Sequence, residues 1–375
     1  MMSYSLILRS LFNDRWLYSL LSWLPLVVFL SIAAIFSSSF ARENVIMVVD
    51  QDNSRLSRQL IRSYHASPNL SVTMSSNIQT AKDALVKGDI YAYVIIPNDL
   101  ERDVKRFRSP LVQSYYNGQF LVIGKQVNAA LAGIHTTINV GIDVGRVMGT
   151  GNTPALQAFG SVMPIRAQMS ALFNSNNDYA QFILSGALPA AWQLIIVLSM
   201  VLIYSKFLKT ESLENKRNIS SILRISLVSG AMLVLQGLVM ACLLFVYKGW
   251  PMRGDWSLIV FAQVLCVMAS QAIALFLVFL LKDRTRALSF AAALTAPSFA
   301  FMGVTFPLDS MPTFSLLWRQ LIPICHYVDI QISQSNHAPA IVHDADSLLK
   351  LAMFGLLFLA ALCLVPQVQK QEVQA

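Results

Sequence analysis

The sequence predicts a membrane α-helical bundle of about six transmembrane helices, with one extracytoplasmic α/β domain inserted after the first helix. Of the 375 residues, 55% are hydrophobic and 13% are charged, whereas soluble domains carry about 25% charged residues. The apolar residues gather in runs of about 20, the length that crosses about 30 Å of hydrocarbon. One long stretch of ordinary soluble composition interrupts them. We therefore divide the chain into residues 1–40, 41–180 and 181–375.

The first part, residues 1–40, combines an interfacial helix with the first span. Residues 4–18 place apolar side chains beside Arg9 and Arg15, which is typical of a helix lying at a membrane surface. The apolar run 17–36 follows without a charge. The alternative is a cleaved signal peptide, whose apolar core is usually about 7 to 15 residues long. Because this run is longer, we interpret it as an uncleaved anchor.

The inserted domain, residues 41–180, alternates strand-like and helix-like segments. Such alternation predicts a small α/β layer with a largely parallel sheet. After it, residues 120–148 carry apolar side chains at steps of three or four, which predicts a long helix. Its apolar stripe either packs on the sheet or contacts a partner subunit. Residues 165–173 alternate like a half-buried strand that returns the chain to the membrane. The expected strands are 44–49, 70–74, 91–96 and 111–116, and the shorter helices are 54–64, 78–86 and 98–107.

Five further runs, apolar on every face as helices in lipid are, belong to the third part of the chain. With six spans and the N-terminus inside, eleven basic residues lie on inner segments and four on outer ones. The positive-inside rule then places both termini in the cytoplasm and the inserted domain outside. The net charge of +8 is thus largely a topology signal, and we expect no nucleic-acid partner. The five runs are 182–204, 222–247, 256–281, 287–306 and 348–365; the inner basic residues are Arg9, Arg15, Lys206, Lys209, Lys216, Arg217, Arg224, Lys282, Arg284, Arg286 and Lys370, and the outer ones are Lys248, Arg253, Arg319 and Lys350.

Three stretches resemble one transporter family. Residues 84–100, Ala-Leu-Val-Lys-Gly-Asp-Ile-Tyr-Ala-Tyr-Val-Ile-Ile-Pro-Asn-Asp-Leu, resemble the outer domain of ABC-2 type transporter permeases. Residues 301–312, Phe-Met-Gly-Val-Thr-Phe-Pro-Leu-Asp-Ser-Met-Pro, and 321–327, Leu-Ile-Pro-Ile-Cys-His-Tyr, look like the segment before the last helix of that family. With the single anchor, the large outer domain and the clustered spans, the likeness covers nearly the whole chain.

The resemblance implies the permease subunit of an ATP-driven exporter in a bacterial inner membrane. The expected partners are ABC ATPase subunits, a second copy or a similar permease, membrane lipids and a periplasmic adaptor protein. We expect no cofactor on this chain, with ATP and Mg on the partner ATPase. The nearest approach to a phosphate-binding loop, residues 118–126, has one intervening residue too many and lies outside. The other hypothesis is a membrane-anchored extracytoplasmic binding or signalling module without transport.

Within this family the inner loop between the second and third spans would be the coupling helix that docks on the ATPase. The alternative is a basic inner loop without a partner. The segment 306–327 is apolar but broken by prolines, so it cannot span, and we expect short re-entrant helices that form an outer gate or a packed lid. The coupling residues are Glu211, Leu213, Glu214, Lys216 and Arg217, and the outer-segment residues are Phe306, Pro307, Leu308, Met311, Pro312 and Pro323.

Polar groups inside the spans are the remaining candidates. An amide in lipid must form hydrogen bonds, so each intramembrane glutamine is expected to face another helix or a transport path. No catalytic constellation and no buried ionisable relay is found in the predicted spans. The last outer loop contains residue types that bind metals, but we expect a solvated loop there and no metal. The glutamines are Gln193, Gln236, Gln263 and Gln271, and the loop residues are His337, His343, Asp344 and Asp346.

Overall fold

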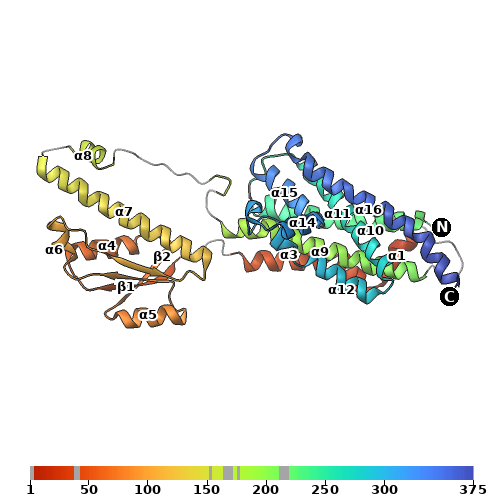
Figure 1. Cartoon of the computed structure of the whole chain (residues 1–375), viewed down its shortest axis with the longest axis horizontal. Coiled ribbons are helices and arrows are strands. Elements are labelled where there is room, and N and C mark those ends of the chain that lie inside the picture. The colour runs from red at the N-terminus through yellow and green to blue at the C-terminus, as the bar shows by residue number, and fades with distance from the viewer. Residues whose placement is uncertain are drawn as a thin grey trace. The chain divides into compact units, whose positions relative to one another are not determined.

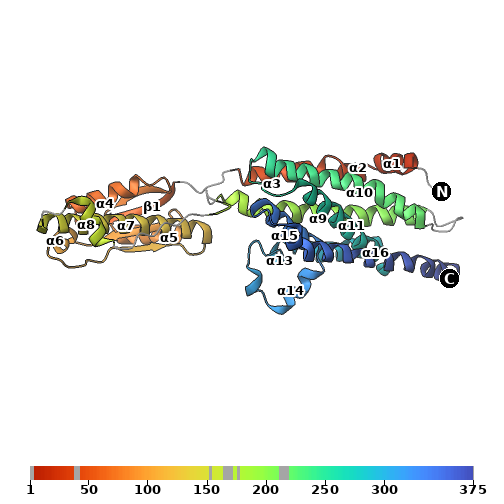
Figure 2. The same cartoon turned by 90° about the horizontal axis from the view of Figure 1, so that it is seen from above.

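A computed structural model describes residues 4–37, 43–151, 154–163, 172–174, 178–210 and 219–374 of the chain. The chain divides into two compact units. The α/β unit comprises residues 40–170, and the helical unit comprises residues 1–39 together with 171–375 (Figures 1 and 2).

The α/β unit is built on one four-stranded sheet with the strand order β2-β1-β3-β4. β1 pairs in parallel with both β2 and β3, whereas β4 pairs antiparallel with β3. The sheet is therefore largely parallel, with an antiparallel edge strand. The strands, each within two residues of the predicted bounds, are β1 (Asn44–Asp50), β2 (Leu70–Ser75), β3 (Ala92–Ile96) and β4 (Gln113–Tyr116).

Helices cover both faces of this sheet, as Figure 1 shows. On one face, Ile46, Val48, Val94 and Ile96 form a core with α4 and α7, while Val49 and Tyr93 pack with α5 on the other. Buried on both sides, the central strands are continuously apolar, as parallel strands usually are. The helices are α4 (Arg55–His65), α5 (Ile78–Lys87), α6 (Leu100–Lys105), α7 (Leu121–Gly151) and α8 (Ala155–Val162).

α7 is one continuous helix of 31 residues, in spite of the glycines within it. Val127 and Leu131 from its apolar stripe are fully buried in the core, and Ile134 and Ile138 pack against it. This part of the stripe therefore packs on the sheet. The predicted returning strand 165–173 lies almost wholly outside the described residues.

Acidic side chains bind the N-terminal N–H groups of α4 and α6. Glu101 of α6 binds the start of α4, and Asp52, which precedes α4, binds the start of α6. Glu101 Oε2 accepts hydrogen bonds from the N–H groups of Arg55 at 2.9 Å and Leu56 at 3.3 Å. Asp52 Oδ2 in turn accepts from the Glu101 N–H at 3.2 Å. The bond to Lys105 and these helix N–H groups lower the pKa of Glu101 to about 2. Asp99 stands at the N-cap position of α6, but its side chain makes no capping hydrogen bond.

The helical unit begins with a broken span. Asp14 separates α1 (Tyr4–Asn13) from α2 (Arg15–Leu21) and caps α2 by accepting the Trp16 and Leu17 N–H groups. α2 and α3 (Leu24–Ile35) together are long and apolar enough to cross a membrane, but they are bent by 48°. Pro25 in the first turn of α3 lacks the N–H that a continuous helix requires.

Four single helices are long and apolar enough to cross a membrane, and the bent α2–α3 pair is a fifth candidate. α10 continues into a π-helix, η1. α11 lies at the centre, packing against α9, α10 and α16. Both views place α1, the end of α9 and the end of α16 at the same end of the helical unit (Figures 1 and 2). The four helices are α9 (Tyr179–Thr210), α10 (Ile219–Ala241) with η1 (Cys242–Tyr247), α11 (Trp256–Leu281) and α16 (Ile341–Gln374).

The run 287–306, predicted as one continuous span, differs in the structure. α12 (Arg284–Thr295) has 12 residues and is followed by the four-residue α13 (Ser298–Phe301). Pro297 explains the break, because its ring removes a donor and clashes with the preceding turn of a helix. The described residues thus contain four or five candidate spans where six were predicted.

Between α13 and α16 the chain forms three short helices, η2 (Leu308–Ser310), α14 (Thr313–Gln320) and α15 (Pro323–Asn336). α15 packs against α9, α11 and α16, and ten of its 14 residues are buried. The loop expected at 337–346 is shorter, because α16 starts at Ile341. Asp344, expected to be solvated, is buried, and its Oδ2 accepts a hydrogen bond from Gln334 Nε2 at 2.6 Å.

Candidate functional site

Three of the four intramembrane glutamines bond to backbone carbonyls of neighbouring helices. Gln236 on α10 donates to the carbonyls of Leu20 at 3.2 Å and Leu21 at 3.0 Å on α2. Gln263 on α11 donates to Gly237 on α10 at 2.8 Å, and Gln271 donates to the carbonyl of Ser226 at 3.0 Å. These three glutamines therefore face neighbouring helices, which is the first of the two arrangements expected from the sequence.

A close contact between α9 and α10 organises the centre of this polar core. Trp192 is fully buried, and its Nε1 donates to the Leu233 carbonyl at 3.1 Å. A Cβ at Gly237 would lie 2.5 Å from Cζ2 of the Trp192 ring. Tyr327 on α15 lies edge-on to the same ring at 5.7 Å, and its hydroxyl accepts from Gln263 at 3.1 Å. Four helices therefore meet at Trp192.

Gln193, the fourth glutamine, follows Trp192 directly in the sequence and is fully buried. Neither of its amide atoms has a hydrogen-bond partner among the described residues. A buried polar atom without a partner costs about 1–3 kcal/mol. Gln236 and Gln263 each keep one amide oxygen without a partner among the described residues, whereas both amide atoms of Gln193 are left for another group.

Three prolines of the predicted outer segment lie at the starts of short helices. Pro307 precedes η2, Pro312 precedes α14, and Pro323 stands in the first turn of α15, where a missing N–H costs little. The side chain of Leu308 packs so closely on Gly303 that a Cβ there would lie 2.8 Å from Leu308 Cδ2. Met311 is 9% exposed, and Phe306 is 48% exposed.

An ion pair that sequence reasoning missed joins α14 to α15. Arg319 is 5% exposed, and its guanidinium donates to the carboxylate of Asp329. Both residues lie outside every predicted span, and Pro323 lies between them. The sequence therefore did not predict that their two helices pack together. The pair holds α14 on the buried α15, because an unpaired charge at this depth is costly.

At the end of α9 that precedes the proposed coupling loop, Lys206 binds the N-terminal segment. Its Nζ donates to Asp14 Oδ2 at 3.0 Å and to the Ser10 carbonyl at 3.1 Å. Burial raises the pKa of Asp14, but the bonds from Lys206 and from the Leu17 and Trp16 N–H groups outweigh it and leave the pKa below its ordinary value. The predicted coupling residues Glu211, Leu213, Glu214, Lys216 and Arg217 lie outside the described residues.

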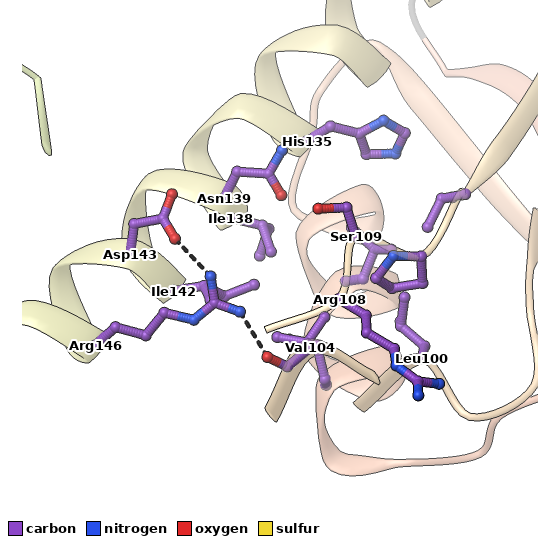
Figure 3. A pocket seen from close by; sticks show the side chains of 14 residues that line it. Leu100, Val104, Arg108, Ser109, His135, Ile138, Asn139, Ile142, Asp143 and Arg146 are labelled. Carbon is purple, nitrogen blue, oxygen red and sulfur yellow. Dashed lines mark hydrogen bonds and ion pairs between the residues drawn. The ribbon is translucent and has the colours of Figure 1, made fainter. Parts of the chain in front are cut away.

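The α/β unit holds a separate cavity of about 380 Å³ between α4, α6 and α7 (Figure 3). Arg146 at its edge is held by Asp143 at 2.9 Å and by the Val104 carbonyl at 2.6 Å. His135 Nε2 lies 2.5 Å from the Tyr64 hydroxyl. Burial lowers the pKa of His135 and raises that of Tyr64, so both groups are neutral near pH 7. The cavity is thus lined by both apolar and polar side chains, and Arg146 and His135 among the polar ones already have partners.

The long apolar helices and their buried amide network define a multi-pass membrane protein that also carries a separate α/β unit. A family model described as ABC-2 family transporter protein matches residues 15–364. The chain therefore belongs to the ABC-2 transporter family and is a membrane component of a transporter. No curated protein and no solved structure matched the chain.

Proposed function

We propose that the chain is the permease subunit of an ATP-driven ABC-2 exporter in a bacterial inner membrane. The observation that carries this proposal is the family match, which extends over both units and every candidate span. The chain supplies the membrane path, and separate ABC ATPase subunits bind ATP and Mg. The α/β unit is extracytoplasmic and contacts an adaptor protein or the exit of the path.

The proposed topology has six crossings with both termini in the cytoplasm. Because α1 and the end of α16 lie at the same end of the helical unit, an even number of crossings is expected. The bent α2–α3 pair and the four single helices supply five. The broken α12–α13 segment then supplies the sixth. The excess of basic residues at the inner ends supports this orientation.

Energy reaches the membrane helices through residues 211–217, which follow α9 directly. The Lys206 bonds to Asp14 and Ser10 support this role, since they tie the last turns of α9 to the N-terminal helices. A displacement of the loop is then passed to α1 and α2 as well as to α9. Two copies form the path, with the segment 306–327 at its outer end.

The test is reconstitution of the full chain with its candidate ATPase in proteoliposomes. Replacing residues 211–217 by a Gly/Ser linker is expected to abolish ATP-dependent transport and co-purification of the ATPase. A linker of the same length at residues 369–375 is the matched control, and it should leave both intact. Equal transport by the two variants would refute coupling through this loop. A binding or signalling module would bind its ligand but move nothing in the same assay.

Orientation is tested by accessibility of single cysteines in a background without the four native ones. Lys87→Cys on α5 should react with an impermeant maleimide from outside whole cells. Lys216→Cys should react only after the membrane is opened. The reverse pattern would overturn the proposed orientation.

A further inference from the structure

We propose that the helical unit contains a binding site for an uncharged aromatic molecule that carries one hydrogen-bond donor. The site is a cavity of about 370 Å³ between the start of α9, η1 and α15. Cavities that bind small molecules are typically about 300–1,000 Å³ and combine apolar and aromatic walls with a few polar groups. This cavity has that size and that composition.

Aromatic side chains form much of its wall. Phe173, Phe182, Phe245 and Trp250 line the cavity from four different segments. Phe173 lies edge-on to the His337 ring at 4.4 Å, and Phe245 lies edge-on to Trp256 at 5.8 Å. Aromatic rings gain about 0.5–1.5 kcal/mol from stacked or edge-on partners beyond the burial of area. The wall therefore favours an aromatic ligand.

The charge of the wall determines the charge of the ligand. None of the described residues that line the cavity is Asp, Glu, Lys or Arg. The nearby Arg253 is outside this lining and is engaged, because its guanidinium lies over the Phe173 ring and donates to the Asn336 carbonyl at 3.3 Å. Moving an ion from water into such a site without a counter-charge is strongly unfavourable. The ligand is therefore uncharged.

Gln331 supplies the specific polar contact. Gln331 lines the cavity and is 1% exposed, and its Nε2 donates to the carbonyl of Ser185, another lining residue, at 3.0 Å. Its Oε1 has no partner among the described residues. Three other polar side chains of the wall already have partners: Asn174 has the backbone of Asp178, Ser185 the Phe182 carbonyl, and Ser335 the Ile332 carbonyl. The free acceptor at Gln331 thus calls for a ligand with an O–H or N–H donor.

The π-helix η1 shapes the same cavity. Leu244 and Phe245 of η1 line it, and Lys248 N–H bonds to the Leu243 carbonyl, five residues back. One extra residue in a turn rotates the side chains after it by about 100° relative to an α-helix. Such π segments occur frequently at functional sites. Here the π segment carries an aromatic side chain into the cavity wall.

The test uses the purified full chain in lipid nanodiscs without an ATPase, so its failure would leave the proposed export function untouched. The probes are para-hydroxymethylbenzophenone, which has a donor, and para-methoxymethylbenzophenone, which has none. After irradiation, labelled peptides are located by mass spectrometry. Labelling of residues 178–185 and 243–251 should saturate for both probes. The hydroxymethyl probe should reach half-saturation at about tenfold lower concentration than the methoxymethyl probe, because it gains one buried hydrogen bond.

Two variants and one control make the result specific. Gln331→Leu should raise the half-saturating concentration of the hydroxymethyl probe to that of the methoxymethyl probe. Ser185→Phe should fill the cavity and abolish saturable labelling by both. Leu227→Phe, at a position on α10 that is 65% exposed, should change nothing.

Three results would overturn the proposal. They are labelling that grows linearly with probe concentration in the unmodified chain, equal half-saturation by the two probes, and unchanged labelling of Ser185→Phe. Should Gln331→Leu fail to fold, the comparison of the two probes on the unmodified chain decides the role of the donor.

Discussion

Replacing Gly237 by alanine perturbs the centre of the helical unit with a single methyl group. Because that methyl would lie 2.5 Å from Cζ2 and 2.9 Å from Cη2 of Trp192, the ring or the helix must move. Overpacking of this kind costs about 1–3 kcal/mol. An alanine in a helix interior is favoured over glycine by about 0.5–1 kcal/mol. We expect a net loss of about 0–2.5 kcal/mol.

A matched glycine separates the two terms. Gly355 lies in α16, and a Cβ there would meet nothing within 4 Å. Gly355→Ala therefore keeps the helix preference without the collision, and the two variants should differ by about 1–3 kcal/mol, the cost of overpacking alone. The measurement is unfolding of the purified full chain by sodium dodecyl sulfate in mixed micelles, followed by circular dichroism.

A compensating change tests the mechanism directly. Trp192→Phe removes the ring atoms that collide, so Gly237→Ala should cost nothing more in that background. The coupling energy of the double-mutant cycle should then equal about 1–3 kcal/mol. Gly237→Ala as stable as Gly355→Ala, or strictly additive effects with Trp192→Phe, would refute the reasoning.

Three further predictions concern charged groups. Arg319→Met leaves Asp329 unpaired and should destabilise the helical unit in the same unfolding assay by about 3 kcal/mol, the lower end of the cost of breaking a buried pair, because the Asp329 side chain is 31% exposed. The double variant with Asp329→Leu should recover most of this loss. Lys206→Gln should lower the free energy of unfolding by less than about 1 kcal/mol, because the side chains of Lys206 and Asp14 are each about one-third exposed. Lys206→Arg should keep the ion pair, so equal stability of the two variants would contradict the contact. The pKa of Glu101 is about 2 in the fold against an ordinary 4.5, so its contribution is complete above about pH 4.5 and is lost as the pH falls towards 2; the melting temperature of Glu101→Gln should show a flatter acid dependence than the unmodified chain.

Local patterns in the α/β unit were sufficient to predict its four strands and the helices α4 to α7, whereas no predicted element corresponds to α8. The strand 44–49 ends at Asp50, the strand 91–96 is stopped by Pro97, and the steps of three and four in residues 120–148 correspond to α7. Each of these signals depends on side chains close together in sequence. The antiparallel pairing of β4 is set by contacts with β3 across the sheet, and no local pattern carried it.

The helical unit shows where hydropathy is insufficient. A hydropathy value averaged over a window of residues does not register that a proline breaks a helix. Pro297 lies two residues after Thr295, the last residue of α12. It also missed α15, because burial there comes from packing by α9, α11 and α16. The candidate sites depend on the same kind of contact. Gln331 reaches Ser185 across 146 positions of sequence, so no spacing rule could have joined them.

The buried amide bonds bear on how a path opens. α10 and α11 are joined by two of them, from Gln263 to Gly237 and from Gln271 to Ser226, and Trp192 joins α9 to α10. Separating α10 from α11 would leave buried polar atoms unpaired at about 1–3 kcal/mol each. A displacement of the whole bundle against a second copy breaks none of these bonds. These bonds therefore support the proposal that the path lies between two copies of the chain.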